Sequence, residues 1–241
     1  MADVLWFDEL DSTNAEARRR AEGGETGDLW IAARRQTHGR GRRGRVWESP
    51  TGNLYATLLT TTDKPPAEAA QLSFVAALAV ADLCDAYTTP GLARLKWPND
   101  VMLGDAKVAG ILIESGGRAG GLWLAIGIGV NLAAPPEAPE RPATALAEYG
   151  DRPAPADALS HLRDAFVRWR GVWDREGFAP IRAAWTDRAY QLGQSCVARL
   201  GSEEVRGVAD GLDATGALLL RLPQAGGVRA IAAGEVFFPS P

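Results

Sequence analysis

Apolar and polar positions along the chain follow two different periods. Short runs rich in β-branched and apolar residues, bounded by turn formers, predict strands over residues 4–7, 29–34, 53–61, 94–97, 101–103, 107–114 and 122–130. Longer segments predict helices over residues 15–21, 65–87, 155–173 and 178–190. The predicted strands cluster instead of alternating one for one with the helices. This order is typical of the α+β fold class.

Local signals mark the ends of several elements. Thr13 and Glu16 have the spacing of a capping box, and Gly23-Gly24 ends the first helix. Gly104-Asp105 predicts a tight turn between two of the strands, which makes them a hairpin. The segment 133–142 is rich in Pro and Ala and predicts a loop.

The pattern changes after residue 192. Four short strands are predicted over residues 196–200, 203–209, 217–222 and 228–232. Turn signals separate them, at Gly201-Ser202, at residues 213–216 and at Gly226-Gly227. Short strands with Gly-rich turns favour a small barrel or sandwich. We therefore expect two domains, residues 1–190 and residues 191–241.

Composition and charge narrow the class of protein. Of the 241 residues, 46% are hydrophobic and 23% are charged, as in ordinary globular proteins. The net charge of -4 argues against a protein that coats nucleic acid. Cys84 and Cys196 lie far apart in apolar runs, so neither a disulfide framework nor a Cys-based metal site is expected, and two histidines exclude a His-rich one. No signal sequence and no apolar run of about 20 residues is evident, so we expect a cytoplasmic protein without membrane contact.

A glycine- and arginine-rich segment, Gly39–Arg45, is the clearest chemical signal. It places four arginines on a flexible backbone, an arrangement suited to holding an anion by bidentate contacts. Its glycines match the dinucleotide-binding spacing, but turn formers and a strand follow where that fingerprint requires a helix. The alternative interpretation is a solvated basic loop. The regular interleaving of Gly and Arg favours the anion-binding one.

Two of the three lysines lie in a second group of polar residues. Lys96-Trp97-Pro98-Asn99-Asp100 falls between two strands, and Lys107 follows the predicted hairpin turn. Asn99 can donate and accept, as recognition of a base edge requires, and Asp100 can accept a proton or hold Mg²⁺. A tight turn with local side-chain bonds is the alternative. The hairpin predicts that Asp100 and Lys107 lie close together.

Three weaker signals complete the set. Asp11-Ser12-Thr13-Asn14 reads first as a helix cap, yet the same geometry can present hydroxyls and backbone N–H groups to a polar ligand. Gln36, just before the arginine segment, is a second polar candidate. Gly127-x-Gly129-x-Asn131 ends a strand, where glycine permits close approach of a ligand or simply relieves packing.

Together these motifs, with Lys107-x-x-Gly110-Ile111-Leu112-x-Glu114, resemble the biotin protein ligases, or biotin–[acetyl-CoA-carboxylase] ligases, from about residue 5 to 238. The resemblance implies a catalytic domain like class II aminoacyl-tRNA synthetases, with a mixed sheet and flanking helices, and a C-terminal SH3-like β-barrel. It implies an enzyme that activates biotin with ATP and Mg²⁺ as biotinyl-5'-AMP. The biotin is then transferred to a lysine of the biotin carboxyl carrier domain of an acyl-CoA carboxylase.

The resemblance also implies roles for individual residues. Biotin would contact Ser12, Thr13, Asn14, Gln36, Arg40, Gly41, Arg42, Lys107 and Gly110. The nucleotide would contact Arg42, Arg45, Trp47, Lys96, Asn99 and Asn131. Catalysis would rest on Lys107, Arg42 and Asp100, with Asp100 holding either Mg²⁺ or the incoming acceptor lysine. His38 departs from the small residue common in relatives, and no adenine-stacking residue is assigned in the segment 133–142.

Partners follow from the same resemblance. The chain starts shortly before the first catalytic strand, so we expect no DNA-binding domain and no DNA binding. A homodimer through the edge of the catalytic sheet is implied by the family, although no residue pattern requires it.

A lipoate or octanoate transferase of related fold is the nearest alternative function. A non-catalytic regulator that binds anions or nucleic acid through the arginine segment is another.

Overall fold

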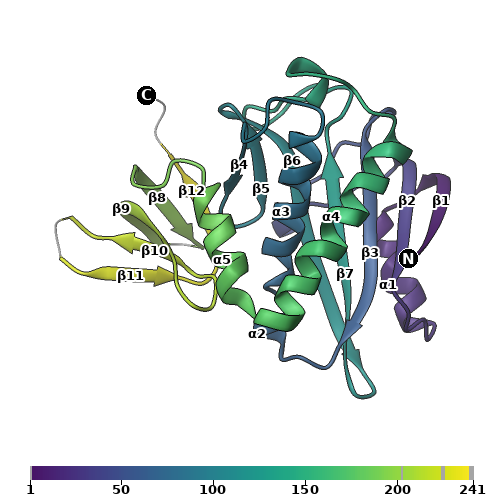
Figure 1. Ribbon diagram of the computed structural model, residues 1–241, viewed down its shortest axis with the longest axis horizontal. Helices are drawn as coiled ribbons and strands as arrows, with labels where there is room; N and C mark the ends of the chain where they lie inside the picture. Colours follow the sequence, from purple (N-terminus) through teal and green to yellow (C-terminus); the bar gives the residue numbers. More distant parts are fainter. Residues whose placement is uncertain (1, 202, 224–225, 239–241) are drawn as a thin grey trace.

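A seven-stranded mixed sheet forms the larger part of the protein. The computed structural model describes residues 2–201, 203–223 and 226–238 (Figure 1). The strand order is β1-β2-β3-β7-β6-β5-β4, with β1 parallel to β2 and every other pair antiparallel. The strands are β1 (Asp3–Leu10), β2 (Leu29–Gln36), β3 (Leu54–Thr62), β4 (Ala93–Lys96), β5 (Asp100–Leu103), β6 (Ala106–Arg118) and β7 (Gly121–Val130). The expected α+β fold with a mixed sheet is confirmed.

Among the described residues, five helices flank the sheets, and two short 3₁₀ turns lie in the connections β2–β3 and β7–α4. They are α1 (Thr13–Glu22), α2 (Pro66–Ala69), α3 (Leu72–Asp85), α4 (Pro155–Glu176) and α5 (Phe178–Asp187), with η1 (Arg42–Gly44) and η2 (Leu146–Glu148). The single helix predicted over residues 65–87 is divided into α2 and α3. Ala70 and Gln71 between them keep right-handed helical dihedrals, so the break is only a tighter turn.

The two faces of the large sheet bury different side chains because strand residues alternate in direction. In β2, Trp30 joins the main core and packs edge-to-face on Phe166 of α4, with ring centroids 6.0 Å apart. Its neighbour Ile31 belongs to a second, smaller core with Ala17 of α1. Helices α3 and α4 therefore cover one face and α1 covers the other. We call the latter the α1 face.

One helical segment corrects an expectation. Residues Pro66–Asp85, which include α2 and α3, are long and apolar enough by composition to cross a membrane, although no such stretch was expected from the sequence. In the structure most of the apolar part of this segment is buried. The apolar residues of α3, among them Val75, Leu78 and Leu83, lie in the main core. The hydrophobicity of this segment is explained by burial on the sheet.

A second sheet follows residue 191. Its order is β11-β10-β9-β8-β12, antiparallel throughout (Figure 1). The strands are β8 (Ser195–Leu200), β9 (Glu203–Leu212), β10 (Leu218–Arg221), β11 (Val228–Ile231) and β12 (Glu235–Phe237). The first four correspond to the predicted strands, whereas β12 was not predicted. Among the described residues β11 and β12 do not pair, so the sheet is open and a closed SH3-like barrel is not confirmed. Ser202, in one predicted turn, lies outside the described residues.

The two sheets share one core. Cys196 and Val236 of the second sheet belong to the same buried cluster as Leu95 and Trp97 of the first. The indole Nε1 of Trp97 donates a hydrogen bond to the carbonyl of Gly216 over 3.1 Å. The segment Lys96–Asp100 is therefore held between the sheets, and its polar residues lie where the two parts meet.

Candidate active site

A cavity of about 380 Å³ opens on the α1 face, a volume that suits a small ligand. Both sheets contribute to its lining, because Glu235 and Val236 of β12 reach it. Every residue assigned a site role from the sequence lines it: Ser12, Thr13, Asn14, Gln36, Arg40, Gly41, Arg42, Arg45, Trp47, Lys96, Asn99, Asp100, Lys107, Gly110 and Asn131. These residues come from six separate segments, and the fold brings them together.

One end of the cavity is neutral and polar. The backbone N–H of Thr13, at the start of α1, donates to Gln36 Oε1 over 2.9 Å, and Gln36 Nε2 donates to Ser49 Oγ over 2.9 Å. The expected capping box is not formed. Ser12 is the N-cap without a side-chain cap bond, while Glu16 pairs with Arg19 and Arg20. The Ser12 hydroxyl is therefore not engaged in capping the helix.

Asn14 is fixed from three sides at this end. Its Oδ1 accepts from the Thr57 hydroxyl over 2.7 Å, and its Nδ2 donates to Glu114 Oε2 over 2.8 Å and to the Leu112 carbonyl over 3.3 Å. Glu114 in turn forms an ion pair with Arg40. Thr57 is fully buried and was missed by sequence reasoning, because a threonine in a strand carries no signal of its own. The network makes this end rigid.

Three glycines form the floor of the cavity. A Cβ at Gly127 would lie 2.0 Å from Asn14 Oδ1, and one at Gly129 would lie 2.6 Å from Trp47 Cε2. A Cβ at Gly110, the cross-strand partner of Gly129, would lie 3.0 Å from Trp47 Cζ3. Glycine is needed here so that Asn14 and the Trp47 indole can approach the strands.

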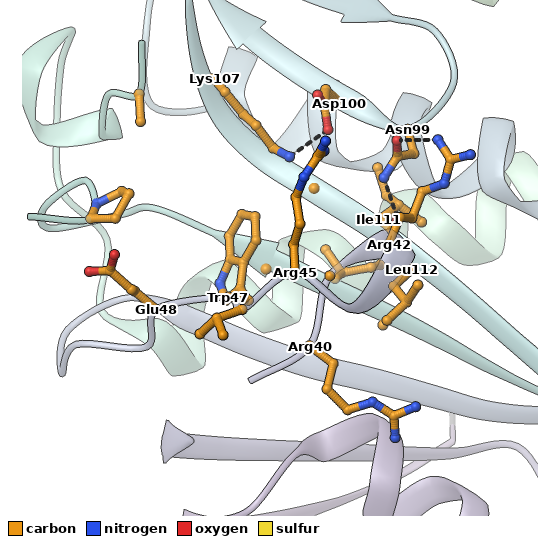
Figure 2. Close-up of a pocket in the computed structure, with 18 of the residues that line it drawn as sticks. Arg40, Arg42, Arg45, Trp47, Glu48, Asn99, Asp100, Lys107, Ile111 and Leu112 are labelled. Carbon is orange, nitrogen blue, oxygen red and sulfur yellow. Dashed lines mark hydrogen bonds and ion pairs between the residues drawn. The ribbon is translucent and has the colours of Figure 1, made fainter. Parts of the chain in front are cut away.

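The arginine segment lies across the cavity. Arg42 donates to Asn99 Oδ1 over 3.1 Å, and Asn99 Nδ2 donates to the Ile111 carbonyl over 2.7 Å (Figure 2). Burial lowers the pKa of Arg42. In Figure 2 the guanidinium of Arg40 points away from Lys107 and Asp100, which agrees with its pairing with Glu114. His38 is exposed, and its Nδ1 forms a hydrogen bond with the Thr37 hydroxyl over 2.9 Å.

Lys107 and Asp100 meet as the hairpin predicts. Lys107 Nζ lies 2.5 Å from Asp100 Oδ1 and 5.2 Å from the centroid of the Trp47 ring (Figure 2). Their side chains are 27% and 14% exposed, so the pair is largely shielded from water. The Trp47 Nε1 is buried and has no hydrogen-bond partner among the described residues. A cation, a carboxylate and an indole ring thus lie together on the cavity wall.

The end of the cavity toward the second sheet is strongly charged. Glu235 pairs with Arg45 at 2.5 Å and with Arg141 at 2.9 Å. These bonds, above all the one from Arg45, lower the pKa of Glu235 to about 2. Burial lowers the pKa of Lys96, whose Nζ lies over the rings of Tyr190 and Phe238. Desolvation of this kind is common where a protein binds an anion.

Glu235 and Arg141 were not predicted as site residues. Glu235 belongs to the unpredicted strand β12, and Arg141 is the last residue but one of the Pro- and Ala-rich segment. Nothing in the local sequence distinguishes them from surface charges. Asn131, which was predicted, is buried, and its Nδ2 donates to the Thr144 carbonyl over 3.0 Å. Asn131 therefore holds the chain at Thr144, just after the Pro- and Ala-rich segment 133–142.

Comparison with known proteins agrees with this geometry. Residues 6–131 match the Biotin/lipoate A/B protein ligase family, and residues 192–238 match the Biotin protein ligase C terminal domain. The chain belongs to the biotin/lipoate protein ligase family. It is 48% identical to the biotin–[acetyl-CoA-carboxylase] ligase of Paracoccus denitrificans over 95% of this chain and 97% of that protein. It is 34% identical to the bifunctional ligase/repressor BirA of Escherichia coli, over 94% of this chain and 71% of BirA.

Solved structures give the same result. The biotin protein ligase of Aquifex aeolicus, in complex with biotin and ATP, superposes with a TM-score of 0.85 at 28% identity, over the full length of both chains. The biotin protein ligase of Leishmania major, in complex with biotinyl-5-AMP, superposes with a TM-score of 0.69 at 25% identity, over 96% of this chain and 99% of that one.

Proposed function

We propose that this protein is an ATP-dependent ligase that activates biotin as biotinyl-5'-AMP and transfers it to a lysine of a biotin carboxyl carrier domain. The observation that carries the proposal is the charge difference between the two ends of one cavity. A neutral ring with amide-like groups fits the end at Thr13 and Gln36, and a polyphosphate fits the end at Arg45 and Lys96. Membership of the family and the Paracoccus relative support the acetyl-CoA carboxylase as acceptor.

Biotin lies at the neutral end in this proposal. Its ureido ring exchanges hydrogen bonds with Ser12, Thr13, Asn14 and Gln36. Thr57 and Glu114 hold Asn14, and Gln36 is bonded to Thr13. The glycine floor admits the flat ring system and its tail. Arg40, Gly41 and Arg42 cover the ligand, and Lys107 contacts the biotin carboxylate beside Gly110.

The nucleotide lies at the charged end. Asn99 and Asn131 hold the nucleoside, Trp47 offers its ring, and Arg42, Arg45 and Lys96 receive the phosphates. In the first step a biotin carboxylate oxygen attacks the α-phosphorus, and the electron pair of the broken P–O bond leaves with pyrophosphate. In the second step the carrier lysine amine attacks the acyl carbon and AMP leaves. Lys107 and Arg42 stabilise the negative charge that develops in both steps.

Mg²⁺ is part of the proposal as an ion that arrives with ATP. Among the described residues no cluster of three His, Cys, Asp or Glu side chains could hold a metal. Mg²⁺ needs only one or two protein carboxylates when phosphates supply other ligands, and Asp100 offers one on the cavity wall. The donor set therefore fits a phosphate-borne ion. Such an ion would neutralise phosphate charge at the reacting centre.

The chain organisation and surroundings belong to the same proposal. The catalytic domain comprises residues 1–190 and the C-terminal domain residues 191–241, in line with the separation of the two sheets. Two buried free cysteines are compatible with a reducing cytoplasm, and the net charge of -4 supports an absence of DNA binding. A homodimer would use strand β1 at the sheet edge, where Trp6 is 40% exposed.

ATP–pyrophosphate exchange with purified protein and Mg²⁺ tests the function. We expect exchange with biotin and none with lipoate, octanoate or no acid. Exchange with lipoate or octanoate instead would assign the chain to the lipoate side of the family. No exchange with any acid would contradict the enzyme function. Transfer of biotin to a purified carrier domain, followed by mass spectrometry of the modified lysine, tests the second step.

A further inference from the structure

Arg141 is the last residue but one of the Pro- and Ala-rich segment 133–142 and lines the charged end of the cavity. Its backbone position is tied to the strand that carries Lys107. The N–H of Lys107 donates to the Pro142 carbonyl over 2.9 Å, and the N–H of Thr144 donates to the Lys107 carbonyl over 2.9 Å. Arg141 thus directly precedes a segment that is paired with the proposed catalytic lysine, and its place relative to that lysine is fixed by main-chain bonds.

The side chain of Arg141 is oriented by two groups of β12. Its Nη2 donates to Glu235 Oε2 over 2.9 Å, and its Cζ lies 4.5 Å from the centroid of the Phe237 ring. In the described part of the chain this is its single hydrogen bond, so most of its five donors are available to a ligand. The side chain is 30% exposed. Because this guanidinium is already oriented, the side chain loses little conformational entropy when it binds a ligand.

The surrounding charges leave this end of the cavity positive. Glu235 is shared between Arg45 and Arg141, so one carboxylate neutralises only part of two guanidinium groups. Cationic side chains outnumber carboxylates on the cavity lining, which contains Arg40, Arg42, Arg45, Lys96, Lys107 and Arg141 against Glu48, Asp100, Glu140 and Glu235. Glu140 is 75% exposed and contributes little screening. A polyanion is the ligand that such a site binds best.

We propose that Arg141 is a further catalytic residue, which contacts the β- and γ-phosphates of ATP and stabilises pyrophosphate as it leaves. This inference rests on the proposed function. When the carboxylate of biotin bonds to the α-phosphorus, the bond from that phosphorus to the bridging oxygen breaks, and the electron pair remains on pyrophosphate. The guanidinium of Arg141 receives the charge that grows there. No motif of the family resemblance includes this position.

The chain offers a matched control on the same aromatic ring. Arg199 stacks on Phe237 with its Cζ 4.3 Å from the ring centroid, yet it pairs with Glu204 and does not line the cavity. Arg141→Ala and Arg199→Ala therefore both remove a stacked guanidinium, and only the first removes a charge from the site. Arg141→Lys retains the charge without the planar donor group.

The experiment measures pyrophosphate half-saturation in biotin-dependent exchange, pyrophosphate binding by calorimetry, and biotin affinity by tryptophan fluorescence. We expect Arg141→Ala to weaken pyrophosphate binding at least about tenfold while biotin affinity stays unchanged. Arg141→Lys should restore part of the pyrophosphate affinity, and Arg199→Ala should behave as the wild type. Wild-type pyrophosphate binding in Arg141→Ala, or an equal loss in Arg199→Ala, would overturn the inference. Absence of exchange in the wild type would refute the enzyme function instead, while calorimetry would still decide on Arg141.

Discussion

Asp100 Oδ1 lies 2.5 Å from Lys107 Nζ although the two residues are on different strands of the β5–β6 hairpin. Asp100 is paired with Gly110 and Met102 with Lys107, and the register shifts between Val101 and Met102. The irregularity changes the alternation of side chains along the hairpin. The shift therefore places Lys107 on the cavity side of the sheet beside Asp100, instead of on the core side with Val101 and Leu103.

Replacement of Lys107 by glutamine should slow adenylation by about 10²- to 10³-fold, because the variant loses the cation nearest the reacting carboxylate and leaves Asp100 without its partner. Single-turnover formation of biotinyl-5'-AMP measures the effect. Lys64→Gln is the control, since Lys64 pairs with Glu68 one helical turn away and does not line the cavity. Near-normal turnover of Lys107→Gln would remove the assigned role.

Substitution of Gly127 by alanine should reduce biotin affinity at least about tenfold, because the new methyl group would overlap Asn14 Oδ1, which is fixed by other bonds. Equilibrium titration followed by tryptophan fluorescence checks this. Gly117→Ala on β6 is the matched control, because a Cβ there meets nothing within 4 Å. Equal affinities in the two variants would show that the floor is not part of the biotin site.

Thr57 should act as a positioning residue for biotin. Thr57→Val keeps the shape of the side chain but leaves the Asn14 amide oxygen without its donor, at a cost of about 1–3 kcal/mol in stability. We expect the KM for biotin to rise while kcat changes little. Thr57→Ser restores the hydroxyl and should restore KM. A purely structural role would lower the unfolding midpoint in Thr57→Val without moving KM.

The ion pairs of Glu235 should make stability depend on pH. Its pKa is about 2 in the folded protein and 4.5 as the reference value, so the unfolded chain binds the proton more readily. The stabilisation is complete above about pH 5.5 and is lost as the pH falls through 4.5 toward 2. It amounts to about 3 kcal/mol when complete.

Urea unfolding of the wild type and of Glu235→Gln measures this contribution. The difference in free energy of unfolding between the wild type and Glu235→Gln should be largest near pH 7 and smaller by about 1 kcal/mol at pH 4. Glu204→Gln is a control, because Glu204 pairs with Arg199 at an exposed site, where ion pairs contribute little. A difference that stays constant with pH would exclude the charged form of Glu235 as the source.

The sequence predicted most strands and helices to within a few residues because each carries a strong local pattern. The predicted turn at Gly104 is present, and this hairpin brought Asp100 and Lys107 together as expected. Motif residues with unusual chemistry for their local context, such as the arginines beside Gly41, were also identifiable. The residues that were assigned a site role all line the cavity, while their individual roles stay predictions.

Strand β12 and the site residues Glu235 and Arg141 could not be predicted, because they depend on contacts between segments distant in sequence. Strand β12 has only three residues and is defined by its pairing with β8, so no period could reveal it. Glu235 and Arg141 become site residues only because the second sheet packs beside the first. The capping box failed for a local reason, since Glu16 pairs with Arg19 and Arg20 within its own helix. Both the capping box and these i,i+3 and i,i+4 pairs fit the spacing, so spacing alone does not decide between them.

Strand β7 serves two compartments with consecutive residues. Gly127 and Gly129 leave room on the cavity side, while Ile126 and Ile128 fill the core on the other side. A shift of one residue in this strand would put isoleucine side chains into the ligand site and leave voids under α3 at the same time. An insertion or deletion of one residue within β7 therefore impairs ligand binding and stability together. Selection for stability alone would also preserve the ligand site, and selection for ligand binding alone would also preserve the core.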